Sequence, residues 1–212
     1  MIKRLFSKNG IGIFWMVITG ILFCAMTACV KLLGTTLSAS QSGFIRYVFG
    51  LIMLTPFCLT LDIKNLQKNV FLILAIRGSI HAIAVIAWFY AMARLPMADV
   101  TALYYLVPIF VMLGASYFFN EQFSVTRACC IIIAFLGTII ILRPGLREVS
   151  SGHLSMLMAT ITFGISFLLA KKVAAEVSPI TIVFMLTLTV TIWLGPLAFM
   201  EWRDPSIKDL VK

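Results

Sequence analysis

Charged residues are scarce in this sequence: only 12% of its 212 residues are Asp, Glu, Lys or Arg, and just eight are acidic. Soluble domains carry about a quarter charged residues. Together with 61% hydrophobic residues and a mean hydropathy of +1.06, this scarcity excludes a cytosolic enzyme, a disordered chain and a disulfide-stapled secreted domain. It predicts an integral membrane protein. The formal net charge of +9 comes from basic residues that flank or interrupt apolar runs, so we interpret it as a topology signal and not as a nucleic-acid-binding surface.

Catalytic and metal-binding motifs are also lacking. The sequence contains no HExxH pair, no GxxxxGK phosphate loop and no GxSxG nucleophile elbow. Its cysteines lie inside apolar runs, without the spacing of a disulfide framework or a zinc site, and we expect buried, inert thiols. They are Cys24, Cys29, Cys58, Cys129 and Cys130. These absences predict a protein that is not an enzyme and has no cofactor and no metal.

Seven apolar runs are present, each long enough to cross a membrane. A helix needs about 20 apolar residues to span the hydrocarbon core. The runs cover residues 11–33, 41–61, 70–93, 97–119, 124–142, 153–172 and 180–200. Because the connections between them are short, we predict an all-α integral membrane protein, a helical bundle of about seven transmembrane helices.

Basic residues give a weak orientation signal. The sequence Lys3-Arg4 and Lys8 precede the first run in the manner of a secretory signal, but the run continues to Leu33 and six more follow, so we predict a retained helix. The positive-inside rule then places the N-terminus in the cytoplasm. Alternating crossings put some basic residues inside (Lys64, Lys68, Arg127, Lys171, Lys172) and others outside (Arg94, Arg143, Arg147, Arg203).

An internal repeat is the most informative pattern. When the chain is shifted by 140 positions (152 minus 12), Gly12 meets Gly152, Lys31 meets Lys171 and Pro56 meets Pro196. The first copy, 11–145, holds five spans, and the second opens over 152–200, followed by a tail over 201–212. An odd number of crossings per copy inverts the second copy relative to the first, as in secondary transporters. Lys212 corresponds to Leu72, so we expect the second copy to be incomplete.

Ionisable residues inside the spans are the first candidates for function, because each is costly in a bilayer. Arg77 and His81 share a helical face with Trp88, and lie roughly 10 Å and 16 Å from Val70 along the helix. For His81 the alternatives are a ligand-binding or proton-coupling role and a structural role, as a neutral ring hydrogen-bonded to a carbonyl. For Arg77 they are binding of substrate and pairing with a backbone carbonyl or with Glu121.

Two further basic residues and one acid leave alternatives open. Lys31 and Arg46 lie near the ends of their spans, and each either has a role in the transport pathway or extends its charge to the interface. Asp99, at the outer entrance of the fourth span, we expect to be solvated near Arg94.

The fourth span carries a second polar group of residues. Tyr104, Tyr105 and Pro108 are predicted on one face, with Pro108 freeing the carbonyl of Tyr104. Paired tyrosines beside a freed carbonyl suit a planar or cationic ligand; the alternative is a packing kink with core tyrosines. Small residues four apart predict close helix contacts, and occur as Gly20, Cys24 and Ala28 in the first span and as Thr160 and Gly164 in the sixth.

A series of short motifs in order resembles the first EamA repeat of the drug/metabolite transporter superfamily. The motifs are Phe44-Ile45-Arg46-Tyr47, Arg77-Gly78, Trp88-Phe89-Tyr90-Ala91, Leu95-Pro96-Met97-Ala98, Pro108-Ile109-Phe110, Asn120-Glu121-Gln122, Gly137 and Leu142-Arg143-Pro144-Gly145. The resemblance implies a ten-helix bacterial inner-membrane transporter with two inverted five-helix repeats around a central cavity, which moves small metabolites by alternating access. The Arg-Gly of the third span, with the Trp and Tyr that follow, is also similar to members that take up S-adenosylmethionine.

The residues and the resemblance together define a candidate site. The cavity implied by the family would be lined by Phe23, His81, Trp88, Tyr105 and Phe163, while Arg46 and Glu121 match the family's arginine of the second span and glutamate after the fourth. The candidate substrate-binding residues are Arg77, His81, Trp88, Tyr104, Tyr105, Pro108, Phe23 and Phe163, and the structural or gating residues are Arg46, Glu121 and Lys31. We expect an anionic or zwitterionic group at Arg77 and an aromatic or apolar part on Trp88 and Tyr105.

The chain departs from the family pattern because it lacks counterparts of helices eight to ten. The alternative function is therefore a truncated or split-gene product without independent transport, or a subunit that needs a partner. Its expected partners are the lipid bilayer and a small-molecule metabolite, with a homodimer or a complementing fragment as further candidates, and no nucleic acid.

Overall fold

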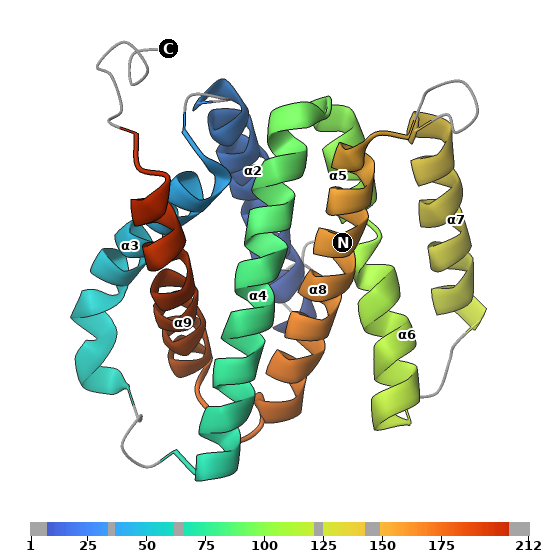
Figure 1. The fold of residues 1–212 in the computed structure, drawn as a ribbon. Helices are drawn as coiled ribbons and strands as arrows, with labels where there is room; N and C mark the ends of the chain where they lie inside the picture. Colours follow the sequence, from blue (N-terminus) through green and yellow to red (C-terminus); the bar gives the residue numbers. More distant parts are fainter. Residues whose placement is uncertain (1–7, 34–36, 62–65, 121–124, 143–148, 204–212) are drawn as a thin grey trace.

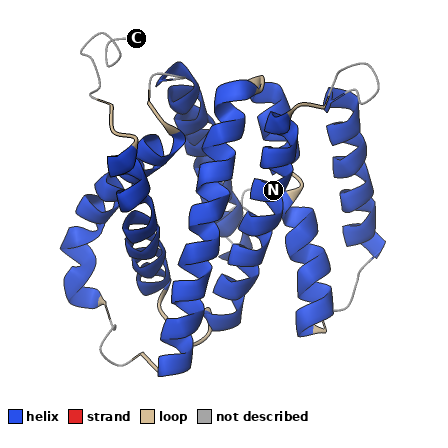
Figure 2. Ribbon diagram, in the orientation of Figure 1, coloured by secondary structure: helices blue, strands red, loops and turns tan. Residues whose placement is uncertain are grey.

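The computed structural model describes residues 8–33, 37–61, 66–120, 125–142 and 149–203. Over these ranges the chain is helical and contains no strand (Figure 2). The α-helices are α2 (Lys8–Leu33), α3 (Ala39–Leu54), α4 (Lys68–Arg94), α5 (Met97–Tyr104), α6 (Val107–Phe119), α7 (Val125–Leu142), α8 (Ser151–Val173) and α9 (Pro179–Met200), and a 3₁₀ helix, η1 (Thr55–Thr60), follows α3. The prediction of an all-α helical bundle is confirmed.

The predicted spans correspond to observed helices with two differences. The 41–61 run is divided into α3 and η1 where Pro56 interrupts the α-helical hydrogen bonds. The 97–119 run is divided into α5 and α6 by a turn at Tyr105 and Leu106, and Pro108 lies in the first turn of α6. Five segments in the described ranges are long and apolar enough to cross a membrane, within α2, α4, α8 and α9 and across α5 and α6 together. The protein is a multi-pass membrane protein.

Successive spans run in alternating directions, and α4 and α8 lie side by side at the centre (Figure 1). The most extensive packing joins α4 to α8, followed by α3 with α9 and α4 with α9. Helix α6 covers the other side of α8, and α7 contacts mainly α5. Helix α2 packs chiefly against α4 and α5 and is mostly exposed on its outer side. These contacts place α4 at the centre of the bundle.

Small residues permit the closest helix approaches. A Cβ added at Gly78 would overlap Thr189 of α9, and one added at Gly164 would lie 3.1 Å from Cβ of Phe110 in α6. The Thr160 hydroxyl, on the same face as Gly164, donates to the Leu103 carbonyl across 3.1 Å. The predicted close contact through Thr160 and Gly164 is therefore confirmed. The equivalent prediction for Gly20 is wrong, since no atom of another helix lies within 4 Å of a Cβ built there.

The 140-residue shift also relates observed helices. Moved by 140, the bounds of α9 (179–200) fall on 39–60, which is the extent of α3 and η1 together. Each of these helices starts with a serine cap: the Ser38 hydroxyl accepts from the Gln41 backbone N–H at 3.2 Å, and Ser178 accepts from Thr181 at 3.4 Å. Helices α3 and α9 thus share the same local start signal.

Two expectations about burial are wrong. Cys24, Cys129 and Cys130 are exposed, with Cys130 on the wall of a surface groove, because exposed surfaces in a membrane protein are as apolar as the interior. The side chains of Cys29 and Cys58 lie outside what the structure describes. Asp99 is buried, at 3% exposure, instead of solvated. Its Oδ2 lies 3.8 Å from Nε2 of His153 on α8, so the first turn of α5 is packed against the start of α8.

Candidate functional site

A cavity of about 160 Å³ lies between α2, α3, α4, α5 and α8. Its lining is aromatic except for one arginine, because each of these helices contributes a large ring at the same depth. The lining residues are Phe23, Arg46, Tyr47, His81, Trp88, Tyr104, Phe163 and Phe167. Five predicted substrate-binding residues are thereby brought together: Phe23, His81, Trp88, Tyr104 and Phe163.

The aromatic rings contact one another around the cavity. Phe23 and Tyr104 are stacked, with ring centroids 4.7 Å apart and planes at 23°. Phe163 lies edge-on to both Tyr104 and His81, at centroid distances of 5.8 Å and 4.9 Å. Trp88 closes the wall beside Phe23 and is only 2% exposed. Such rings offer apolar faces for a flat ligand and negative π-clouds for a cationic one.

The two basic side chains of the cavity, Arg46 and His81, come from α3 and α4. The guanidinium carbon of Arg46 lies 5.2 Å from the centroid of the Tyr47 ring, a cation–π contact that holds the charge beside the cavity. His81 is 7% exposed, and its Nδ1 lies 3.0 Å from the Ser166 hydroxyl on α8. No acidic residue is among the described residues that line this cavity. The site therefore combines a fixed cation and an imidazole with an apolar wall.

Arg77 does not line the cavity. Its Nε donates to the Ser166 carbonyl at 3.2 Å and its Nη1 donates to the Ile182 carbonyl at 3.0 Å. Of the alternatives that the sequence left open, pairing with backbone carbonyls is the one observed. A single buried side chain thereby joins α4, α8 and α9.

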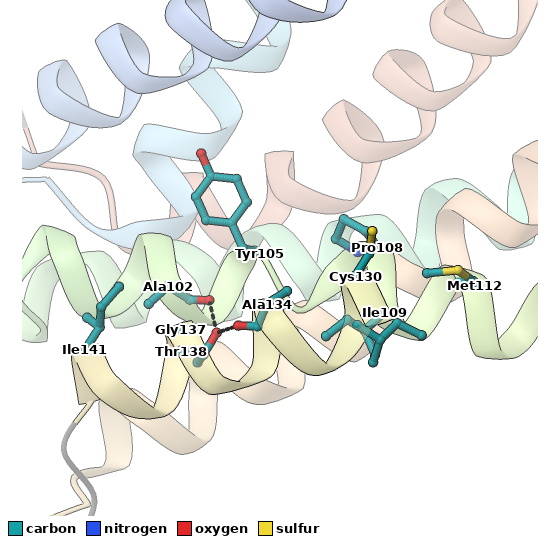
Figure 3. A pocket seen from close by; sticks show the side chains of 11 residues that line it. Ala102, Tyr105, Pro108, Ile109, Met112, Cys130, Ala134, Gly137, Thr138 and Ile141 are labelled. Atoms are coloured by element: carbon teal, nitrogen blue, oxygen red, sulfur yellow. Dashed lines mark hydrogen bonds between the residues drawn. The ribbon is translucent and has the colours of Figure 1, made fainter. Parts of the chain in front are cut away.

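Tyr105 and Pro108 lie on a different face from Tyr104. Consecutive helical residues point about 100° apart, so Tyr104 enters the cavity while Tyr105 is 58% exposed. Tyr105 and Pro108 instead line an apolar groove of about 410 Å³ between α5, α6 and α7 (Figure 3). Thr138 of α7 joins the walls of this groove by donating to the Ala102 carbonyl at 3.2 Å. The predicted common face for Tyr104, Tyr105 and Pro108 is wrong.

Two predicted residues lie outside what the structure describes. Glu121 belongs to a segment that is not described, and Lys31 lies in α2 but its side chain is not described. Two cavity residues were not among the candidates. Phe167 lies four residues after Phe163, so a one-turn extension along α8 would have found it, whereas Tyr47 lies directly after Arg46 and no helical spacing marks it.

A second hollow, of about 590 Å³, lies where α3 begins and α4 and α9 end. Its lining includes Ser40, Arg94 and Glu201, and the Ser40 hydroxyl donates to Glu201 Oε2 at 3.3 Å. Beside it, the fully buried Gln41 donates through Nε2 to the Arg203 carbonyl at 2.7 Å and accepts from the Arg203 N–H at 3.2 Å. The side-chain amide of Gln41 thus joins the start of α3 to the segment after α9 through two hydrogen bonds.

Comparison with known proteins agrees with this architecture. The model of the EamA-like transporter family matches residues 10–143, which hold four of the five cavity-forming helices. The chain belongs to this family.

Named relatives transport different molecules. The chain is 26% identical to an S-adenosylmethionine uptake transporter of Rickettsia bellii over 200 residues, which are 94% of this chain and 69% of the relative. It is 27% identical to a riboflavin transporter of Rhizobium johnstonii over 194 residues, 91% of the chain and 64% of that protein. It is 25% identical to a pseudopaline exporter of Pseudomonas aeruginosa, covering 92% of the chain and 69% of the exporter.

Proposed function

We propose that this EamA protein is an inner-membrane secondary transporter, with a cytoplasmic N-terminus, that moves small amphiphilic metabolites by alternating access. The observation that carries the proposal is the aromatic cavity with Arg46 and His81 at its edge. A charged side chain inside a bilayer is costly unless it serves a ligand or a pathway. No nucleophile paired with a base lines the cavity among the described residues, so we propose a binding and transport role and no catalysis.

The chemistry of the lining favours a substrate with two unlike ends. An anionic group, such as a carboxylate, pairs with the Arg46 guanidinium, because the planar fork of donors in a guanidinium matches the two oxygens of a carboxylate. A flat ring or a soft cation packs against Tyr104, Trp88 and Phe163. Arg46 takes the role that the sequence suggested for Arg77, since both observed Arg77 hydrogen bonds are made to backbone carbonyls.

S-adenosylmethionine, the molecule named for the Rickettsia relative, has both ends: an amino-acid carboxylate, and a purine and sulfonium that suit aromatic walls. The sequence similarity to that relative extends over most of the chain. We therefore propose S-adenosylmethionine as the first substrate to test, with riboflavin, named for another relative, as the second.

Substrate entry requires the cavity to enlarge. Pockets that bury a drug-sized ligand measure about 300–1,000 Å³, against about 160 Å³ here. The wall with the least packing behind it is α2, which contributes Phe23 and contacts chiefly α4 and α5. We propose that α2 moves outward, and that separation of the Phe23–Tyr104 stack accompanies opening.

Uptake into proteoliposomes tests the function. The full chain is reconstituted and the uptake of radiolabelled S-adenosylmethionine is compared for the parent, Arg46→Gln and Arg94→Gln. Arg94 is the matched control, because its guanidinium lies over the Tyr90 ring, 3.5 Å from its centroid, outside the cavity. We expect Arg46→Gln to raise KM by about tenfold or more, the equivalent of ~1.4 kcal/mol, and Arg94→Gln to leave it within twofold. Equal values for the two variants would contradict the proposed site.

A second candidate is transport only with a partner that covers α2, the candidate span in the described residues with the smallest share buried inside the bundle, 6%. Large apolar side chains such as Phe14, Trp15 and Val17 are exposed along it. If a second copy or a complementing fragment covers this face, crosslinking through cysteines introduced at Phe14 and Val17 will give a defined adduct, and uptake will require the crosslinking partner. Uptake by single-chain particles with no adduct would exclude this candidate.

A further inference from the structure

Ser166 touches the cavity only through another residue. It lies in the middle of α8, is fully buried, and is not among the side chains that line the cavity. Its hydroxyl is 3.0 Å from Nδ1 of His81, which does line it. A hydrogen bond to one ring nitrogen of a histidine fixes both the plane of the ring and the edge that is turned away.

The geometry leaves Nε2 of His81 for a ligand. Nε2 has no hydrogen-bond partner among the described residues, whereas every fully buried side-chain nitrogen or oxygen in those ranges has one. Nε2 is therefore not sealed in the protein, and the space next to the ring is the cavity. Rotation of the ring by half a turn about χ2 would put carbon Cδ2 where Nδ1 lies and break the bond to Ser166.

Ser166 is itself held in place by Arg77. Nε of Arg77 donates to the Ser166 carbonyl, and Nη1 donates to the Ile182 carbonyl of α9. Arg77 and His81 are four residues apart on α4, so one turn of α4 contacts Ser166 at its carbonyl and at its hydroxyl. This arrangement fixes the depth of Ser166 relative to His81.

We propose that Ser166 is a positioning residue of the cavity: it orients His81 so that Nε2 faces the bound metabolite, and Arg77 fixes Ser166 for that task. The proposal rests on the proposed function, because the ligand is the transported metabolite. It assigns a role in substrate affinity to a residue on α8 that makes no contact with the cavity.

The simpler role for a buried serine is to join two helices. Ser155 provides that case on the same pair of helices, since its hydroxyl donates to the Ala87 carbonyl of α4 at 2.9 Å. Ser155 lies outside the cavity and contacts no titratable group in this bond. Ser155→Ala is therefore the matched control for Ser166→Ala: each removes one hydroxyl that bonds α8 to α4.

Uptake kinetics separate the two roles. Radiolabelled S-adenosylmethionine uptake is measured for the parent, Ser166→Ala and Ser155→Ala, each also combined with His81→Ala. We expect Ser166→Ala to raise KM about fivefold, the loss of one hydrogen bond, with the maximal rate kept, and to have no further effect in the His81→Ala background. Ser155→Ala is expected to leave KM unchanged in both backgrounds.

A spectroscopic readout does not depend on transport. The chain contains two histidines, His81 and His153, so imidazole ¹⁵N resonances of the histidine-labelled protein in nanodiscs report on each ring. We expect Ser166→Ala to shift the His81 signals and to leave those of His153 in place. His153 bonds Ser150 at the start of α8, far along the helix from Ser166, and serves as the internal reference.

The outcomes distinguish the two proposals. A shift of the His81 resonances with a KM effect specific to Ser166→Ala supports both. If the parent transports nothing, the proposed function fails for this probe, and the resonances alone decide the positioning role. Unchanged His81 resonances in Ser166→Ala, or equal KM effects of the two alanine variants, overturn the proposal that Ser166 positions His81.

Discussion

Replacing Gly78 by alanine should destabilise the bundle at the point where α4 crosses α9. The added Cβ would overlap Cβ of Thr189 and lie 2.7 Å from its Cγ2. The overlapping Cβ of Thr189 is bonded directly to Cα of the α9 backbone, so no side-chain rotation moves it away. Overpacking of this kind costs about 1–3 kcal/mol, while alanine in place of glycine returns about 1 kcal/mol of helix propensity. A net loss of up to about 2 kcal/mol is expected.

The measurement is the free energy of unfolding in mixed detergent micelles, followed by circular dichroism as SDS is added. Gly20→Ala is the matched control, because a Cβ at Gly20 meets nothing within 4 Å and the substitution should be neutral or stabilising. Thr189→Gly in the Gly78→Ala background removes the overlapping atoms and should recover stability relative to Gly78→Ala alone. If Gly78→Ala is as stable as Gly20→Ala, the close α4–α9 crossing is refuted.

Two further substitutions test the ends of the helices. Gln41→Leu removes both hydrogen bonds to Arg203 and should lower the free energy of unfolding by about 2–4 kcal/mol. Gln67 is the control: it is exposed at the start of α4 and its side chain makes no capping hydrogen bond, so Gln67→Leu should change the free energy of unfolding by less than about 0.5 kcal/mol. Similar values for the two variants would contradict the Gln41 assignment. Asn120 ends α6 in the left-handed conformation, with φ of 50°. Asn120→Gly should therefore be tolerated, whereas Asn120→Val should lower the free energy of unfolding by about 1 kcal/mol or more. Equal stability of the two variants would disprove the left-handed conformation.

The spans could be predicted from the sequence because length and apolarity are set by the thickness of the bilayer. All seven predicted runs correspond to observed helices, and the departures occur at Pro56 and around Tyr105, where a proline interrupts or restarts the backbone pattern. The 140-residue match also anticipated that α3 with η1 and α9 have corresponding bounds.

The face that each residue presents could not be predicted in the same way. In a soluble helix, polar residues mark the outside, but here lipid and protein interior are equally apolar, so hydropathy does not distinguish them. Tyr104 and Tyr105 were assigned alike although one enters the cavity and the other is exposed. The sequence likewise could not show which of Arg77 and Arg46 lines the cavity, since only the packing of α8 and α9 supplies the carbonyls that hold Arg77.

The same pair of neighbouring tyrosines tests the central claim most directly. Tyr104→Ala removes a ring from the cavity and breaks the stack with Phe23, while Tyr105→Ala removes an identical ring from the outer groove. Stacking of a flat ligand on an aromatic side chain is worth about 1–3 kcal/mol, so KM for S-adenosylmethionine uptake should rise about tenfold in Tyr104→Ala and stay within twofold in Tyr105→Ala. Equal loss of uptake in both variants, or a larger loss in Tyr105→Ala, would contradict the assignment of this cavity as the substrate site.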